Sequence, residues 1–86
     1  MTCNMYQVYA IYNRKHGKLY IGQTEDLEKR LQLHNTKAFG GYTSGFDGGW
    51  VVIYSEEVGS RSAALKRETQ LKSYQGRMFV KKFIPA

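Results

Sequence analysis

Three short segments are rich in apolar, β-branched and aromatic residues, a composition typical of strands. They are residues 7–12 (QVYAIY), 18–22 (KLYIG) and 50–55 (WVVIYS), and the third is the most apolar. The polar turn NRKHG separates the first two and predicts a hairpin, and a one-residue slip of its register would separate Tyr9 from Tyr20. We take the register that places Tyr12 opposite Leu19. In that register Tyr9 faces Gly22 and shares a face of the sheet with Tyr20, and Gly22 leaves a gap beside Tyr9 that a ligand could enter. We expect the third strand to be central in the packing.

The segment after the second strand contains a possible helix cap followed by apolar residues at helical spacing. Thr24 is expected to cap this helix, and three acidic residues in the first turn suit the positive end of its dipole. Leu27 and Leu31 form an apolar stripe that His34 continues. Arg30 borders the same face, and an arginine beside a core-facing stripe predicts a buried or cleft-bound anion.

A second helix is expected from a cap at Ser60 or Ser62 to about Tyr74. Glu68 lies in the middle of its apolar stripe, where a carboxylate is costly unless a cation such as Arg67 or Lys72 compensates it. The stripe consists of Ala64, Leu65, Leu71 and Tyr74. We therefore treat Glu68 as a candidate functional acid.

The last segment predicts a short amphipathic helix beginning at Gly76. Its inward side chains are expected to be Met78, Phe79 and Phe83. Residues 73–76 would separate it from the preceding helix.

Residues 36–49 have neither a helical nor a strand period and contain five of the nine glycines. Lys37 and Tyr42 lie here with two phenylalanines, and aromatic side chains among glycines can stack on nucleic-acid bases. A loop held by its own aromatic side chains is the alternative interpretation.

A chain of 86 residues predicts one domain, residues 1–86. The single cysteine, Cys3, excludes an intrachain disulfide and a cysteine-based zinc cluster. This fits a reducing compartment, and we expect a cytoplasmic protein. No apolar run is long enough to span a bilayer and no signal-peptide pattern is present, so we expect no membrane partner.

The net charge of +6 and the pI of about 9.6 favour an anionic partner, foremost nucleic acid. From residue 58 onward Glu68 is the only acid, against seven lysines and arginines. Candidate nucleic-acid contacts are Lys37, Tyr42, Lys66, Arg67, Lys72 and Arg77.

Several of these segments recur together in one family. They are YIG at 20–22, QVY at 7–9, DLEKRL at 26–31 followed by HN at 34–35, ALKRE at 64–68, LKS at 71–73 and GR at 76–77. In this order the chain resembles the GIY-YIG endonuclease superfamily, and in particular its small stand-alone bacterial members. The resemblance covers nearly the whole chain.

The resemblance implies an α/β (α+β) fold with a three-stranded antiparallel sheet flanked by helices. It also implies metal-dependent cleavage of a phosphodiester, with DNA as the expected substrate. Tyr9 and Tyr20 would hold the attacking water or act on its proton, and Arg30 would bind the scissile phosphate. His34 would contact the phosphate or move a proton. Glu68 would ligate one divalent cation, Mg²⁺ or Mn²⁺.

Gln23 departs from the family pattern, because many members have lysine there. A tyrosine with an ordinary pKa of about 10 is a poor base and needs a nearby cation, such as the metal or Arg30. Two other functions therefore stay open: a nucleic-acid-binding module without cleavage, and a protein-interaction domain. A protein partner could also supply specificity to the nuclease.

Overall fold

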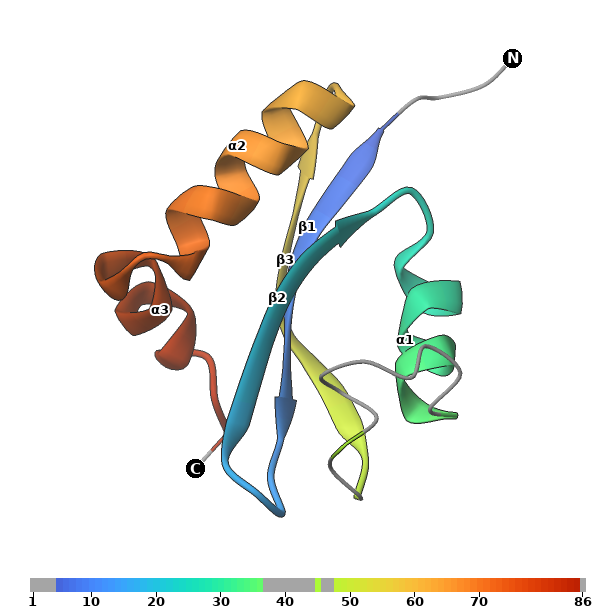
Figure 1. Cartoon of the computed structure of the whole chain (residues 1–86), viewed down its shortest axis with the longest axis vertical. Coiled ribbons are helices and arrows are strands. Elements are labelled where there is room, and N and C mark those ends of the chain that lie inside the picture. Colours follow the sequence, from blue (N-terminus) through green and yellow to red (C-terminus); the bar gives the residue numbers. More distant parts are fainter. Residues whose placement is uncertain (1–4, 37–44, 46–47, 86) are drawn as a thin grey trace.

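The computed structural model describes residues 5–36, 45 and 48–85. The strands are β1 Tyr6–Asn13, β2 Lys18–Thr24 and β3 Trp50–Val58, and the helices are α1 Leu27–Asn35, α2 Arg61–Lys72 and α3 Tyr74–Lys81. The strands form one antiparallel sheet in the order β2-β1-β3 (Figure 1). The predicted α+β fold with a three-stranded sheet is confirmed.

The register of the β1–β2 hairpin is the predicted one. Tyr12 pairs with Leu19, and Tyr9 pairs with Gly22. The expectation that the third strand is central is wrong, because β1 lies between the other two strands. Four consecutive β1 residues, 8–11, are buried, as a strand covered on both faces requires. β3 is an edge strand and continues past the predicted end to Val58.

The two faces of the sheet are covered by different helices, α1 on one side and α2 with α3 on the other (Figure 1). Alternation along β1 sends Tyr9 and Ile11 toward α1, and Val8 and Ala10 toward α2. The α1 side is completed by Trp50, Tyr20, Leu27, Leu31 and Val52. The α2 side is completed by Ile21, Ala64, Leu71 and Val80.

Helix α1 begins at Leu27 with Asp26 as its N-cap, so the predicted cap at Thr24 is wrong. The Asp26 carboxylate accepts from the Lys29 backbone N–H at 3.1 Å. Thr24 is the last residue of β2, and its hydroxyl accepts from the Asp26 N–H at 3.1 Å in the connecting turn. The hydroxyl is therefore occupied three residues before the helix starts.

Ser60 caps α2 as predicted, accepting from the Ala63 N–H at 3.1 Å. The break between the last two helices is Ser73 alone, which caps α3 by accepting from the Gly76 N–H at 3.2 Å. Helix α3 therefore starts at Tyr74, two residues before the predicted Gly76. A serine between two helices can end one and start the next because its side chain replaces the missing backbone acceptor.

Several apolar side chains expected to point inward are exposed. Leu65, Tyr74, Met78, Phe79 and Phe83 are 44, 77, 49, 36 and 45% exposed, whereas Val80 is fully buried. Phe79 and Phe83 pack on the ring of Tyr54, with centroids 5.3 and 5.2 Å away. Within the described ranges, none of the helices has the length and apolar character needed to cross a bilayer.

Candidate active site

The side chains of Tyr9, Tyr20 and His34 meet on the α1 side of the sheet. The Tyr9 hydroxyl lies 3.0 Å from His34 Nε2, and both side chains are buried. The ring of Tyr20 lies 5.0 Å from that of His34 and 6.4 Å from that of Tyr9, measured between centroids. Two strands and one helix thus bring together two phenols and an imidazole, as the sequence predicts.

Gly22 makes this arrangement possible, because the Tyr9 ring passes over it. A Cβ at position 22 would lie 2.8 Å from the Tyr9 hydroxyl oxygen and 3.1 Å from Cε2 of Tyr20. The predicted gap beside Tyr9 is therefore filled by the protein's own phenol. The glycine serves the close packing of two aromatic rings rather than entry of a ligand.

The electrostatics of the site favour neutral forms of Tyr9 and His34. Burial raises the pKa of Tyr9; Tyr20 and Glu68 raise it further, and Arg30 opposes them. Burial, and then the charge of Arg30, lower the pKa of His34. The expectation that Arg30 activates a tyrosine does not hold for Tyr9 in the protein alone, because the desolvation of a phenolate outweighs the attraction of the guanidinium.

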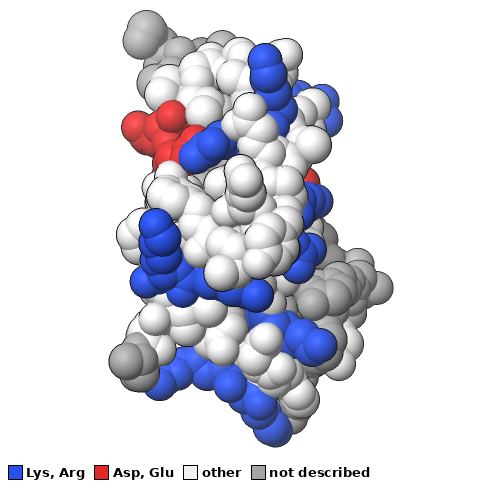
Figure 2. Space-filling view, turned by 90° about the vertical axis from the view of Figure 1, so that its left-hand side faces the viewer, with Lys and Arg blue, Asp and Glu red and all other residues white. Residues whose placement is uncertain are grey.

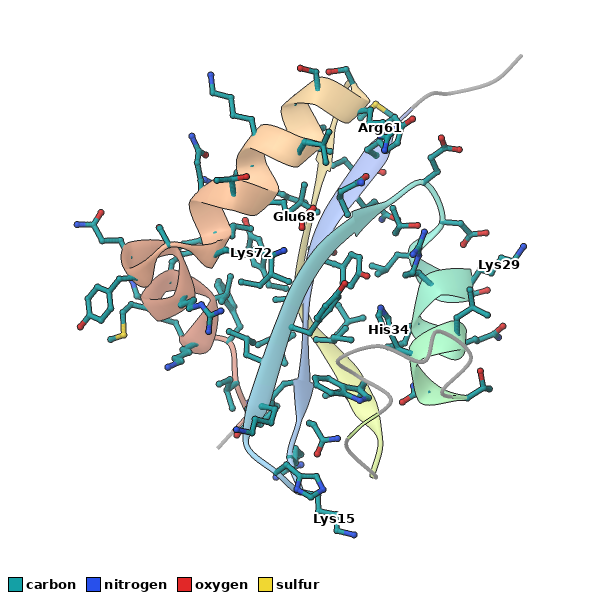
Figure 3. The ribbon with its side chains drawn as sticks, in the orientation of Figure 1. Lys15, Lys29, His34, Arg61, Glu68 and Lys72 are labelled. Carbon is teal, nitrogen blue, oxygen red and sulfur yellow. The ribbon has the colours of Figure 1, made fainter. Side chains whose placement is uncertain are left out.

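Arg30 lines a groove of about 440 Å³ beside the end of β2 and the start of α1. Gln23 and two further cations, Lys29 and Arg61, line the same groove, together with the two acidic residues of the β2–α1 turn. Figure 3 shows Arg61 reaching this end of the sheet from the start of α2. Cations outnumber acids in this groove by one, and an arginine there is suited to bind a phosphate through its planar fork.

Glu68 comes from α2, on the other side of the sheet. Its carboxylate is 20% exposed and lies 2.7 Å from Nζ of Lys72. Figure 3 shows both side chains pointing from α2 toward the sheet, while His34 points toward it from α1. The negative charge of Glu68 also contributes to the raised pKa of Tyr9, after burial and Tyr20.

The Glu68 side chain fits a divalent cation as a single protein ligand. Its carboxylate already holds a cationic group, the Lys72 ammonium, and it is mostly shielded from water. Among the described residues, no three His, Cys, Asp or Glu side chains gather into a metal-binding group. One carboxylate completed by waters and phosphate oxygens is a common shell for Mg²⁺.

The predicted nucleic-acid contacts occupy different environments. Lys66 and Arg77 are exposed, whereas Arg67 is held by Glu56, with Nε 2.9 Å from Oε2. Lys72 is paired with Glu68. Lys37 and Tyr42 lie outside the described residues. The face formed by α2 and α3 is nevertheless mostly basic, with acidic side chains at its margins (Figure 2).

Two residues escaped the sequence reasoning. Asn35 joins the end of α1 to the start of β3: its amide donates to the Trp50 carbonyl at 3.1 Å and accepts from the Trp50 N–H at 2.7 Å. Arg61 shares the groove of Arg30 although the two are far apart in the chain. The polar asparagine directly after His34 was a signal for the first, and no local pattern pointed to the second.

Comparison with known proteins places these features in a family. A model of the GIY-YIG catalytic domain matches residues 5–82. The chain is 37% identical over 60 residues to a UPF0213 protein of Staphylococcus saprophyticus, covering 70% of this chain and 72% of that protein. It is 38% identical over 71 residues to a UPF0213 protein of Haloquadratum walsbyi, covering 83 and 79%.

A solved structure has the same fold. The solution NMR structure of a UPF0213 protein from Bacillus halodurans superimposes with a TM-score of 0.53 at 20% identity. The match covers 93% of this chain and 85% of that one. At this identity the likeness supports the fold.

Proposed function

Because this chain belongs to the GIY-YIG catalytic domain family, we propose that it is a metal-dependent endonuclease that hydrolyses phosphodiester bonds of DNA. A GIY-YIG domain indicates nuclease-type activity in general and implies a nucleic-acid substrate. GIY-YIG nucleases generally use divalent metal ions. We add three points to this general indication: the substrate is DNA, this chain requires a metal, and individual residues have the roles given below.

The observation that carries the proposal is the environment of the Tyr9 hydroxyl. It contacts His34 at 3.0 Å, lies beside Tyr20, and is influenced by the charges of both Arg30 and Glu68. These are the five residues that the sequence selected, and they come from four elements of the fold. A surface built only to bind nucleic acid does not require a buried phenol–imidazole pair.

We assign to Tyr9 and His34 the removal of a proton from the attacking water. With its raised pKa, Tyr9 remains a phenol and His34 a neutral imidazole. In the His34 tautomer with Nδ1 protonated, the phenol donates to Nε2. As the water oxygen bonds to phosphorus, its proton passes to the Tyr9 oxygen and the Tyr9 proton passes to His34, so no phenolate accumulates.

Tyr20 then positions the water, and Arg30 neutralises charge on the nonbridging oxygens. The phosphorus–oxygen bond to the leaving group breaks, and the leaving oxygen takes a proton from solvent. In the groove beside Arg30, Arg61 and Lys29 supply positive charge next to Gln23, where many relatives have lysine. Arg61 is therefore our candidate for the missing cation.

A divalent cation would be held by Glu68, with waters and substrate oxygens completing its shell. When bound, such a cation stabilises negative charge on phosphate and leaving oxygens as a Lewis acid. Mg²⁺ and Mn²⁺ both suit a carboxylate ligand. The contribution of this chain is to hold the carboxylate on α2 and shield it from bulk water.

A binding module without cleavage is the second candidate, and Gln23 favours it. In that case Arg30 would still bind phosphate, and the Tyr9–His34 pair would be only a buried hydrogen bond. A protein partner that directs the domain to its substrate is compatible with either function.

The test is cleavage of labelled DNA in duplex, flap and single-stranded form, with Mg²⁺ or Mn²⁺, and of RNA in parallel. Wild type should cut at least one DNA substrate, and Glu68→Gln and Arg30→Ala should be slower by about 10²–10³. Glu57→Gln, which removes an exposed acid of β3, is the matched control and should cut like wild type. No cleavage by wild type, with DNA affinity reduced in Arg30→Ala, would support the binding module.

A further inference from the structure

The ammonium group of Lys72 is paired with the Glu68 carboxylate, which is the group that would bind a metal. Its Nζ lies 2.7 Å from Glu68 Oε2, one helical turn earlier on α2. Because the carboxylate is only 20% exposed, an unpaired charge there would be costly, and the lysine compensates it. A divalent cation at Glu68 and the Lys72 ammonium in its present position would repel each other.

The surroundings of Lys72 offer a second position for the ammonium group. Lys72 lines a pocket of about 250 Å³ with Tyr20, Arg77, Leu19 and Ile21. Its side chain is 47% exposed, so rotation away from Glu68 requires no repacking of the core. The pocket lies beside Tyr20 and is lined by the cation Arg77 and by no acidic residue, so the displaced ammonium group would have to stay hydrated there, which its exposure allows.

We propose that Lys72 is a displaceable counter-ion: it neutralises Glu68 in the metal-free protein, competes with the metal for the carboxylate, and swings into the Tyr20–Arg77 pocket when a metal binds. This inference rests on the proposed role of Glu68. In this scheme, binding of the metal breaks the Lys72–Glu68 ion pair and leaves the Lys72 ammonium group next to Tyr20.

The first test is the affinity for Mn²⁺ alone, measured by electron paramagnetic resonance on the full chain without DNA. An ion pair at the surface with one half-exposed partner contributes up to about 1 kcal/mol, so Lys72→Met should bind Mn²⁺ about fivefold more tightly than wild type. Lys72→Arg keeps a competing cation and should resemble wild type. Lys81→Met removes an exposed charge from α3 without touching Glu68 and should also resemble wild type.

The second measurement follows the lysine itself. Acetylation of Lys72, quantified by mass spectrometry, should increase on addition of Mg²⁺, with the exposed Lys66 of α2 as internal reference. Equal Mn²⁺ affinity in wild type and Lys72→Met, or no change in Lys72 reactivity, would overturn the displacement. Wild-type Mn²⁺ affinity in Glu68→Gln would instead reject Glu68 as the metal ligand, and with it the proposed function.

Discussion

Adding a single methyl group at Gly22 would disrupt the packing of the candidate active site. The Tyr9 hydroxyl crosses the backbone of β2 there, and a Cβ would meet that oxygen at 2.8 Å and the Tyr20 ring at 3.1 Å. Both atoms belong to aromatic rings held in the core cluster under α1. Neither ring can retreat without disturbing the contact with His34.

Gly22→Ala should therefore impair the site more than the fold. Overpacking of this kind costs about 1–3 kcal/mol of unfolding free energy, and displacement of both phenols should lower cleavage strongly. Urea denaturation and the cleavage assay measure the two effects. Gly59→Ala is the matched control, because a Cβ at Gly59 meets no atom within 4 Å. A fully active Gly22→Ala would contradict the placement of Tyr9.

His34 makes stability depend on pH. Burial, and then Arg30, lower the pKa of His34 below its ordinary 6.5, so the unfolded chain binds this proton more readily than the folded protein. The contribution to stability is fully present above about pH 6.5 and is lost as the pH falls through the folded-state pKa. Urea midpoints across this range should fall less steeply in His34→Gln than in wild type. If the urea midpoints of wild type and His34→Gln changed in parallel with pH, His34 would not be the cause of the pH dependence.

At the scale of elements, the sequence predicted the type of each element and the pairing of the strands better than the ends of the helices and the side chains that they turn toward the sheet. The assumed β1–β2 register is the observed one, so Tyr9 and Tyr20 share a face of the sheet as expected, although the turn and the apolar pattern alone did not exclude a one-residue slip. The cap of α1 was not, because Thr24 and Asp26 both suit an N-cap and only the turn between them decides. Asn35 contacts Trp50 across fifteen positions, which no local pattern contains.

The exposed side chains of α2 and α3 have a related explanation. Periodicity identifies an apolar stripe, but not which edge of it contacts the sheet. Ala64 and Leu71 are buried on α2, whereas Leu65, beside Ala64, is 44% exposed. The α2–α3 turn at Ser73 sets the direction of α3 and buries Val80 instead of the larger phenylalanines.

Gly76 permits that turn. A Cβ there would overlap the Gln70 carbonyl oxygen and lie 2.6 Å from the backbone carbonyl carbon of Leu71. Backbone atoms inside a helix cannot yield as a side chain does. Gly76→Ala should cost about 1–3 kcal/mol in chemical denaturation, although alanine is the better helix former. Gln75→Ala, its exposed neighbour, should be nearly neutral; an unchanged midpoint in both would contradict the tight α2–α3 contact.

At the scale of the whole molecule, charge is distributed to serve the proposed site. The helices on the α2 side present exposed Lys66, Lys72, Arg77 and Lys81 (Figure 2). At the C-terminal end of β2, the groove of Arg30 contains two further cations, Lys29 and Arg61. Tyr20 lines the pocket between β2 and this basic face. A nucleic-acid backbone bound along these basic side chains would pass next to Tyr20.

This distribution predicts the salt dependence of binding. Removing one cation that binds a phosphate should reduce the slope of log affinity against log salt by about 0.9 on duplex DNA. Arg77→Ala removes an exposed cation beside the Tyr20 pocket and should reduce the slope by about that amount, with a similar effect on every DNA sequence. Fluorescence anisotropy over a salt series, without metal so that DNA is not cleaved, measures it.

Thr69→Ala provides the comparison, since Thr69 is an exposed α2 residue without charge and should leave the slope unchanged. A wild-type slope near zero would favour the protein-interaction domain over both nucleic-acid functions, because counterion release accompanies any binding through phosphates. A steep wild-type slope that Arg77→Ala leaves intact would move the backbone contacts away from the Tyr20 pocket and toward the groove of Arg30. The slope thus separates the classes of function and locates the substrate on one of the two basic surfaces.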